Sequence, residues 1–469
     1  MLESMLMNTV RTRIAPSPTG QDLHIGNAYT ALINYVFAKK YGGEFVIRIE
    51  DTDKTRFVEG SEERILASLA WLGLRHAEGP DIGGPFNPYR QSERLEVYKK
   101  YAEELIEKGH AYYCFCTSDR LAAMRKDQEA NHEAPMYDGR CRELKTQSSK
   151  LNAQKEPCVI RLRVPDEGVT VFHDEIRGDI SFENKLIDDQ VLLKSDGYPT
   201  YHLGVVVDDH LMKISHIIRG EEWISSTPKH VLLYQFFGWK PPLFAHMPLL
   251  RNPDKSKLSK RKNPVWVGDY INKGFLPEAI LNYLATMAWM HPDGKEIFSV
   301  LEMVGAFNLL AIQTTAPIFD IEKLRWMNGE YLRKTQSSKL KVQIFDFYNG
   351  KYDQNLIERT IPLVIERMKT LAEYRSLAEF FFIRPEEFER PVDKKLVGIA
   401  SKALESTEWN HDAMEAAIRL ETEKAGMKAK DVFMELRVAI TGKTVGPPLL
   451  ESLEILGKED TLIRLSLAK

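Results

Sequence analysis

The sequence predicts a multidomain α/β protein: a Rossmann-like domain that carries an inserted α/β domain, followed by an all-α C-terminal region. Three observations predict this: a βαβ pattern within the first fifty residues, a change of character over 114–204, and the loss of strand signals after about residue 335. At 469 residues the chain has room for about three domains. Its content of 43% hydrophobic and 28% charged residues excludes disordered and collagen-like proteins.

The βαβ pattern covers residues 10–50. Val10–Ala15 is a short β-prone run that precedes a Pro/Gly-rich stretch. From Ala28 to Lys40 the apolar residues recur at helical spacing, and two glycines then stop the helix. Phe45–Glu50 alternates between apolar and polar residues, as a strand does. A strand, loop, helix and strand in about 40 residues predict a parallel pair with a right-handed crossover.

Further elements follow in order. Ser61–Leu72 and Glu93–Lys108 have helical patterns, and Val159–Val164 is rich in β-formers. The segment 191–198 predicts a hairpin that turns at an Asp-Gly pair. Val205–Val207 is a continuous β-branched run, which predicts a buried parallel strand in the second half of the Rossmann-like domain.

The remainder of the chain is mainly helical. Lys255–Lys262 is a strongly basic loop, Pro277–Met290 predicts a helix with proline in its first turn, and Leu356–Phe382 represents the amphipathic helical segments of the C-terminal region. We therefore expect five segments, with these boundaries: 1–113 and 205–250 for the two halves of the Rossmann-like domain, 114–204 for the insertion, 251–335 for a domain that contains the basic loop, and 336–469 for the helical domain.

Composition also bears on location and partners. No apolar run reaches the roughly 18 residues that span a bilayer, and the first residues lack the apolar core of a secretory signal. Four cysteines in this length do not form a disulfide scaffold. We expect a cytoplasmic protein with no membrane partner. The net charge of −3 means that any nucleic-acid surface must be built from local basic patches.

Two sequence blocks suit phosphate chemistry. The first is Arg13–Gly20 followed by His24–Asn27, where a histidine and a glycine stand at a strand-to-helix transition. The spacing differs from the G-x-G-x-x-G and P-loop patterns. The second is Lys257–Arg261, in which lysines cluster on a short loop. Alone, the first is equally compatible with an ordinary loop histidine and the second with a solvated surface; together they suit charge stabilisation during nucleotidyl transfer.

Together the two blocks resemble the two signatures of class I aminoacyl-tRNA synthetases. Further blocks resemble bacterial glutamyl-tRNA synthetases over nearly the whole chain: Arg13–Gly20, Arg48–Asp53, Tyr89–Arg94, Ser195–His202, Val206–His210, Glu221–Trp223, Leu324–Gly329 and Leu436–Gly442. The resemblance implies ATP-dependent activation of L-glutamate to glutamyl-adenylate, with Mg²⁺, and transfer to the 3′-terminal adenosine of tRNA(Glu). AMP and pyrophosphate would be released, and a monomer is expected. The resemblance further implies that 114–204 binds the acceptor end of the tRNA and that 251–335 carries the second signature and contacts the tRNA stem.

The resemblance also implies roles for individual residues. Catalytic charge stabilisation falls to His24, Lys257 and Lys260. ATP contacts are implied at Pro16, Thr19, His24, Gly26, Asn27, Glu222, Lys257, Ser259 and Lys260. Glutamate contacts are implied at Arg13, Ala15, Ser17, Glu50, Tyr201, Arg219 and Trp223.

Within the glutamate set, Arg13 would pair with the side-chain carboxylate, because a planar guanidinium meets a carboxylate at two points. Glu50 would take the ammonium and Arg219 the α-carboxylate side. Without the family context, Arg48 and Asp53 read as an ordinary surface ion pair, and Trp223 as a core aromatic.

Two positions depart from the family pattern. Asn27 stands where many class I enzymes have histidine, a substitution that the glutamyl enzymes tolerate. Val205 stands where related enzymes often carry asparagine. The loss of that amide would remove one hydrogen bond to glutamate, worth about 0.5–1.5 kcal/mol.

Three cysteines are spaced as zinc ligands. Cys114, Cys116 and Cys141 offer thiolates from two short segments, and zinc requires four ligands in a tetrahedron. Some bacterial glutamyl enzymes resemble this arrangement. The fourth ligand is open between Tyr137 and Glu143, and three reduced thiols without metal are the alternative. Cys158 lies outside the pattern and is assigned to the core.

The helical tail is expected to bind the anticodon, since unstacked bases are read by arginine and aromatic planes. Arg367 matches a position where arginine accompanies reading of the third anticodon base and exclusion of the glutamine tRNA. The sequence leaves open whether one or both tRNAs are charged. Two alternative functions are a tRNA-modifying relative, which resembles the catalytic half only, and a catalytically inactive RNA-binding module.

Overall fold

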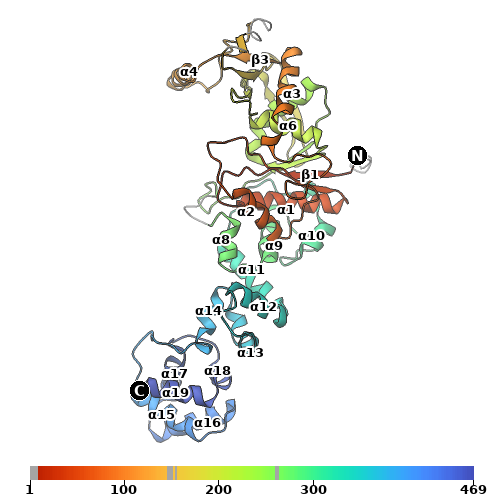
Figure 1. Cartoon of the computed structure of the whole chain (residues 1–469). Helices are drawn as coiled ribbons and strands as arrows, with labels where there is room; N and C mark the ends of the chain where they lie inside the picture. The colour runs from red at the N-terminus through yellow and green to blue at the C-terminus, as the bar shows by residue number, and fades with distance from the viewer. Residues whose placement is uncertain (1–8, 145–151, 154–155, 259–263, 469) are drawn as a thin grey trace. The chain divides into compact units, whose positions relative to one another are not determined.

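The computed structural model describes residues 9–144, 152–153, 156–258 and 264–468. The chain divides into two compact units, one made of residues 1–269 and 281–320, the other of residues 270–280 and 321–469. Figure 1 shows the course of the chain through both. Within the described ranges, every helix is too short or too polar to cross a bilayer.

The predicted βαβ unit opens the first unit. β1 (Arg11–Ile14) pairs in parallel with β2 (Glu44–Ile47), with Arg13 opposite Val46. α1 (Ile25–Lys40) connects them and buries its apolar residues. The helix begins where the His24 side chain accepts a hydrogen bond from the Gly26 amide at 3.0 Å. The predicted strand, helix and strand are therefore confirmed, and they place the residues after β1 at the start of α1.

A four-stranded sheet with the order β6-β5-β9-β8 continues this unit. Its members are β5 (Val169–Asp174), β6 (Gly178–Glu183), β8 (His216–Gly220) and β9 (Leu243–Met247). β8 and β9 are parallel. The Ser215 amide, directly before β8, donates to the Arg11 carbonyl of β1 at 3.0 Å, so β1 runs beside the start of β8. β5 joins β9, with Asp174 opposite Phe244. A hairpin from within 114–204 thus completes a sheet whose other strands come from 205–250.

The strand predicted at Val205–Val207 is wrong. These residues lie in α6 (Tyr201–Leu211), and each is 2% exposed or less. α6 packs against α3 (Leu95–Glu107) and α7 (Thr227–Phe237), which bury it on several sides. A short apolar run is as compatible with a helix buried on several sides as with a buried strand, so the pattern alone could not separate them.

The remaining part of 114–204 contributes a small antiparallel sheet. The segment supplies β4 (Val159–Leu162), the middle strand, and β7 (Val191–Leu193), while the third strand, β3 (Ala111–Cys114), begins before it. The predicted hairpin turn follows β7: the Gly197 amide donates to the Lys194 carbonyl at 3.0 Å, and Gly197 has a φ of 81°.

Other helices are α2 (Ser61–Trp71), α4 (Ser118–Ala130), α8 (Val267–Asn272), α9 (Pro277–Ala288) and α10 (Val300–Ala306).

The described residues of the second unit form helices and turns, with no strand (Figure 1). Its core is built from apolar helix faces such as Leu340, Ile357 and Leu436. The helices are α11 (Ile321–Lys334), α12 (Ser337–Phe347), α13 (Gln354–Val364), α14 (Glu373–Ala378), α15 (Lys394–Glu405), α16 (His411–Lys424), α17 (Ala429–Thr441), α18 (Leu449–Leu456) and α19 (Lys458–Leu467). The predicted fold class is confirmed. The five exact boundaries stay predictions.

Candidate active site

A cavity of about 930 Å³ opens in the first unit at the ends of β1, β2 and β8. It is lined by fourteen of the residues that the sequence proposed for substrate contacts: Arg13, Ala15, Pro16, Ser17, Thr19, His24, Gly26, Asn27, Glu50, Tyr201, Arg219, Glu222, Trp223 and Lys257. Ser259 and Lys260 lie outside the described residues. Trp223 is half-buried and lines the cavity, with its ring 4.1 Å from that of Tyr201, so the alternative of a core aromatic does not hold.

The two signature blocks converge on this cavity. The Ile25 amide at the start of α1 donates to the Val265 carbonyl at 2.7 Å, which ties the His24 block to the chain that follows the basic loop. Gly20 lies so close to Trp266 that an added Cβ would stand 2.4 Å from the indole ring. Because His24 Nδ1 accepts from Gly26, its proton is on Nε2, which can donate to a phosphate oxygen. Segments 240 residues apart, at Ile25 and Val265, therefore meet at one place.

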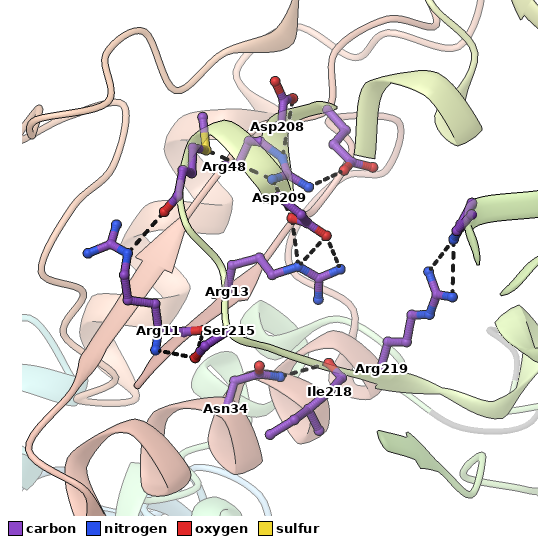
Figure 2. A network of polar contacts seen from close by, with 12 residues as sticks. Arg11, Arg13, Asn34, Arg48, Asp208, Asp209, Ser215, Ile218 and Arg219 are labelled. Atoms are coloured by element: carbon purple, nitrogen blue, oxygen red, sulfur yellow. Dashed lines mark hydrogen bonds and ion pairs between the residues drawn. The ribbon is translucent and has the colours of Figure 1, made fainter. Parts of the chain in front are cut away.

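Arg13 is buried at the end of β1 and pairs with Asp209 of α6. Its Nε and Nη2 atoms each lie 3.1 Å from one oxygen of the Asp209 carboxylate. Nη1 makes no hydrogen bond within the described chain, and Figure 2 shows it directed away from Asp209. Only one edge of the guanidinium is used, so a second carboxylate can still bind the remaining nitrogen.

Arg48 connects Asp209 to Glu50. Its Nη1 donates to Asp209 at 2.7 Å and its Nη2 donates to Glu50 at 3.0 Å, while the side chain is fully buried. Burial by itself raises the pKa of Asp209, but the charges of Arg13 and Arg48 outweigh it and hold the pKa below its ordinary value. One buried arginine thus fixes the carboxylate that orients Arg13 and the carboxylate expected to face the substrate ammonium.

The alternative of a surface ion pair between Arg48 and Asp53 does not hold, because Arg48 is fully buried and Asp53 pairs with Arg56 at 2.6 Å. The neighbouring Asp208 takes three buried donors of its own: Arg94, Tyr98 and Gln91, at 2.8, 2.8 and 2.9 Å. The sequence motifs assign no role to Asp208 and Asp209 individually. The signal that could have found them is a pair of carboxylates directly after an apolar run, since buried charges require partners.

Arg219 on β8 has a different environment. It is 5% exposed, and its partners are neutral: Tyr201 Oη at 2.9 Å, Thr227 Oγ1 at 2.8 Å, His246 Nε2 at 3.1 Å and His230 Nδ1 at 3.3 Å. Among the described residues no carboxylate lies within ion-pair distance of it. Figure 2 shows Arg219 on its own strand, apart from the Arg13–Asp209 pair. The cavity wall therefore carries a buried positive charge without a counter-ion.

Val205 is 2% exposed and does not line the cavity. Tyr201, one helical turn earlier on α6, does. The valine offers no polar group, and the loss of a hydrogen bond to glutamate at this position stays a prediction.

The three candidate zinc ligands come together at the end of β3. The Sγ atoms of Cys114, Cys116 and Cys141 lie within 4.8 Å of one another. The Tyr137 hydroxyl lies 3.5 Å from Cys114 Sγ and 3.3 Å from Cys116 Sγ. The Glu143 side chain is instead 90% exposed and lies 3.8 Å from Arg163. The soft donor set fits zinc, with Tyr137 rather than Glu143 as its neighbour.

In the second unit, Arg367 is exposed on a 3₁₀ turn, Ile365–Arg367. Burial and the positive charge of Arg367 lower the pKa of Arg437. Two arginines are therefore close enough to repel each other, which favours an anion beside them.

Comparison with known proteins agrees with this geometry. The catalytic-domain model of the class I tRNA synthetases for E and Q matches residues 9–326, and an anticodon-binding-domain model matches 326–469. A glutamate–tRNA ligase of Psychrobacter sp. (strain PRwf-1) is 47% identical, with 99% of this chain and 94% of the relative covered. The chain belongs to the glutamate–tRNA ligase family. The glutamate–tRNA ligase of Cellvibrio japonicus is also 47% identical, over 98% and 93% of the two chains.

Solved structures of the glutamate–tRNA ligase family have the same fold. The enzyme of Elizabethkingia meningosepticum, crystallised in complex with its amino acid, is 36% identical with a TM-score of 0.86, over 98% of this chain and 99% of that one. The enzyme of Elizabethkingia anophelis matches with a TM-score of 0.85. As a member of this family the chain is an aminoacyl-tRNA ligase, which confirms the sequence-based identification.

Proposed function

We propose that the cavity binds ATP and L-glutamate together and that the chain charges tRNA(Glu). The observation that carries the proposal is that His24, Lys257 and the buried Arg219 line the same cavity, and that no carboxylate among the described residues neutralises Arg219. A phosphate end and a carboxylate end in one cavity suit the joining of an amino acid to a nucleotide.

In the first step an oxygen of the glutamate α-carboxylate attacks the α-phosphorus of ATP. The bond to the β-phosphate oxygen breaks, pyrophosphate leaves and glutamyl-adenylate forms. In the second step the 2′-hydroxyl of the terminal adenosine attacks the acyl carbon and AMP leaves. Mg²⁺ bound with ATP offsets the negative charge of the phosphates. Holding both reactants in one cavity is worth about 7–11 kcal/mol in favourable cases.

The residues of the cavity divide these tasks. His24 Nε2 and the Lys257 ammonium face the phosphates, where negative charge accumulates; Lys260 has the same proposed role. Arg13 presents Nη1 to the glutamate side chain, and Glu50 faces the ammonium. Arg219 holds a carboxylate of the same substrate. A glutamine in this position would leave buried guanidinium charge uncompensated, which disfavours it strongly.

The zinc site is proposed at Cys114, Cys116 and Cys141, with Tyr137 as the fourth ligand. Zinc would join the end of β3 to the loop around Cys141 and supply structural cohesion there. The anticodon is proposed to bind the second unit, with Arg367 reading the third base and Arg437 beside it. We also expect a cytoplasmic monomer.

The alternative functions receive less support. A relative that resembles only the catalytic half would lack the anticodon-binding domain matched over 326–469. An inactive module would have no reason to keep both His24 and Lys257 in the lining of one cavity.

The test is charging of purified protein with separately transcribed glutamate and glutamine tRNAs, ATP and labelled glutamate or glutamine. We expect acid-precipitable label with glutamate and the glutamate tRNA only. No label with any tRNA would refute the ligase activity, and label with both tRNAs would refute the discriminating role of Arg367 while leaving the ligase activity intact.

A further inference from the structure

The neutral partners of Arg219 form a buried chain that extends well beyond the cavity. It begins at Asp174 on β5, whose Oδ2 lies 2.6 Å from His246 Nδ1. His246 on β9 meets Arg219 Nε through Nε2 at 3.1 Å. Beyond the guanidinium, His230 of α7 contacts both Nη atoms at 3.3 Å and reaches His202 Nδ1 through Nε2 at 3.1 Å. Asp174, His246 and His230 are each 1% exposed or less.

The direction of each hydrogen bond follows from Arg219, which can only donate. His246 Nε2 must accept from it, so the proton of His246 is on Nδ1, where the Asp174 carboxylate accepts it. His230 Nδ1 must likewise accept, so the proton of His230 is on Nε2 and is donated to His202. The two histidines beside the same arginine therefore hold opposite tautomers.

Both histidines must also be neutral for this arrangement to exist. Burial lowers the pKa of His246, Asp174 opposes this effect and the nearby charge of Arg219 adds to it, and together they bring the pKa to about 4. Burial and then Arg219 lower the pKa of His230 well below its ordinary value. Arg177 and Lys229 are the other cations that face the chain. The Arg219 guanidinium is thus held by neutral groups, which accept its hydrogen bonds without supplying negative charge.

We propose that His246 and His230 are positioning residues, which hold the Arg219 guanidinium by fixed tautomers and keep its charge available for a carboxylate of the substrate. Asp174 and His202 set the tautomers. This inference rests on the proposed function, in which Arg219 binds glutamate. An aspartate or glutamate in place of either histidine would hold the arginine equally well but would neutralise it. The cavity would then lose its attraction for an anion.

Asparagine and glutamine provide a matched test, because the amide oxygen of asparagine replaces Nδ1 of histidine and that of glutamine replaces Nε2. His246 accepts through Nε2, so H246Q should keep a lower KM for glutamate than H246N. His230 accepts through Nδ1, so H230N should keep a lower KM than H230Q. Each unfavourable variant should raise the KM for glutamate by roughly tenfold to a hundredfold, the range for a hydrogen bond to a charged group, with the KM for ATP nearly unchanged.

A merely structural role predicts no such reversal between the two positions. The same preference for one amide at both positions, or equal changes in both KM values, would overturn the proposal. His216 is the control, since it lies on the same strand as Arg219 but contacts Phe37 and Ser215 outside the cavity. H216N and H216Q should show equal KM values for glutamate.

The charge claim is tested by H230D against H230N, which differ only in charge. H230D should raise the KM for glutamate at least about tenfold above that of H230N, and equal values would overturn this part. Nitrogen NMR of ¹⁵N-histidine-labelled protein tests the tautomers without any assay of activity. A proton on Nε2 of His246 or on Nδ1 of His230 would refute the network even if the protein charges tRNA. A protein that charges no tRNA but shows both expected tautomers would refute the proposed function instead.

Discussion

Arg13 and Asp209 form a buried ion pair in which Nε and Nη2 of the arginine each lie 3.1 Å from a carboxylate oxygen. Asp209 in turn accepts from Arg48. The pair fixes the plane of the Arg13 guanidinium before any substrate arrives. Pre-organisation of this kind lowers the entropy lost on binding.

Replacement of Arg13 by lysine should impair glutamate use specifically. The ammonium can satisfy Asp209 or the substrate, but it lacks the separate nitrogens with which the guanidinium serves both. We expect the KM for glutamate to rise by roughly tenfold to a hundredfold, with the KM for ATP within about twofold. Arg11→Lys is the matched control, because Arg11 lies on the same strand and pairs with Glu78 away from the cavity. Equal effects at both positions would contradict the role of Arg13.

Replacement of Arg48 by methionine should destabilise the fold. Removal of this fully buried cation leaves Asp209 and Glu50 with one partner fewer in a site closed to water. Loss of one member of a buried ion pair costs about 3–5 kcal/mol. Thermal unfolding should show a clearly lower Tm for R48M. The control is R56M, which removes the partner of Asp53. Because the Arg56 side chain is 74% exposed, this change should lower the free energy of unfolding by at most about 1 kcal/mol.

Purified protein should contain one zinc ion for each chain. Mass spectrometry under native conditions should show the ion lost in C114S, C116S and C141S. C158S is the control and should keep it, because Cys158 lies outside the three-thiol cluster. Loss of zinc in E143Q with retention in Y137F would reverse the assignment of the fourth ligand.

Stability should fall as the pH falls from about 6.5 towards 4. Burial lowers the pKa of His216 to about 4, as it does for His246. Within this window the unfolded chain takes up protons that the folded chain does not, so each such histidine lowers the free energy of unfolding by about 1.4 kcal/mol per pH unit. The free energy of unfolding of H216Q, measured with urea at several pH values in this window, should change with pH by about that amount less per pH unit than in the parent protein. An unchanged slope would contradict the lowered pKa.

Replacement of Arg367 by alanine should weaken tRNA recognition without affecting the amino-acid site. Loss of an arginine that stacks on or bonds a base costs roughly tenfold to a hundredfold in affinity. The KM for the glutamate tRNA should rise by this factor, while the KM for glutamate stays constant. Arg375, whose guanidinium lies 2.9 Å from Glu379, is the control within the same unit. Discrimination against the glutamine tRNA should relax in R367A only.

The first βαβ unit could be predicted because its pattern is local. The apolar spacing over Ala28–Lys40 belongs to one helix, and the glycines that follow end it. Val205–Val207 could not be assigned correctly. Because α3 and α7 bury α6 on several sides, these positions are all apolar and do not alternate with the polar residues that reveal a helical period.

The candidate site shows the same division. Arg13, Glu50 and Arg219 were found from motifs, but the groups that hold them were not. Asp174 and His246 are 72 residues apart, and nothing in either local sequence indicates that they meet. Such contacts depend on the register of neighbouring strands, which single-sequence patterns do not encode.

The place of β5 and β6 has a consequence for engineering. Because this hairpin is hydrogen-bonded to β9 and supplies Asp174, the stretch between β3 and α6 is not an interchangeable cassette. A chimaera that takes residues 114–204 from a distant relative would import an edge of the catalytic sheet along with the small antiparallel sheet. Donor sequences for such transplants should therefore be chosen by the compatibility of Asp174 and its surroundings with the recipient's His246.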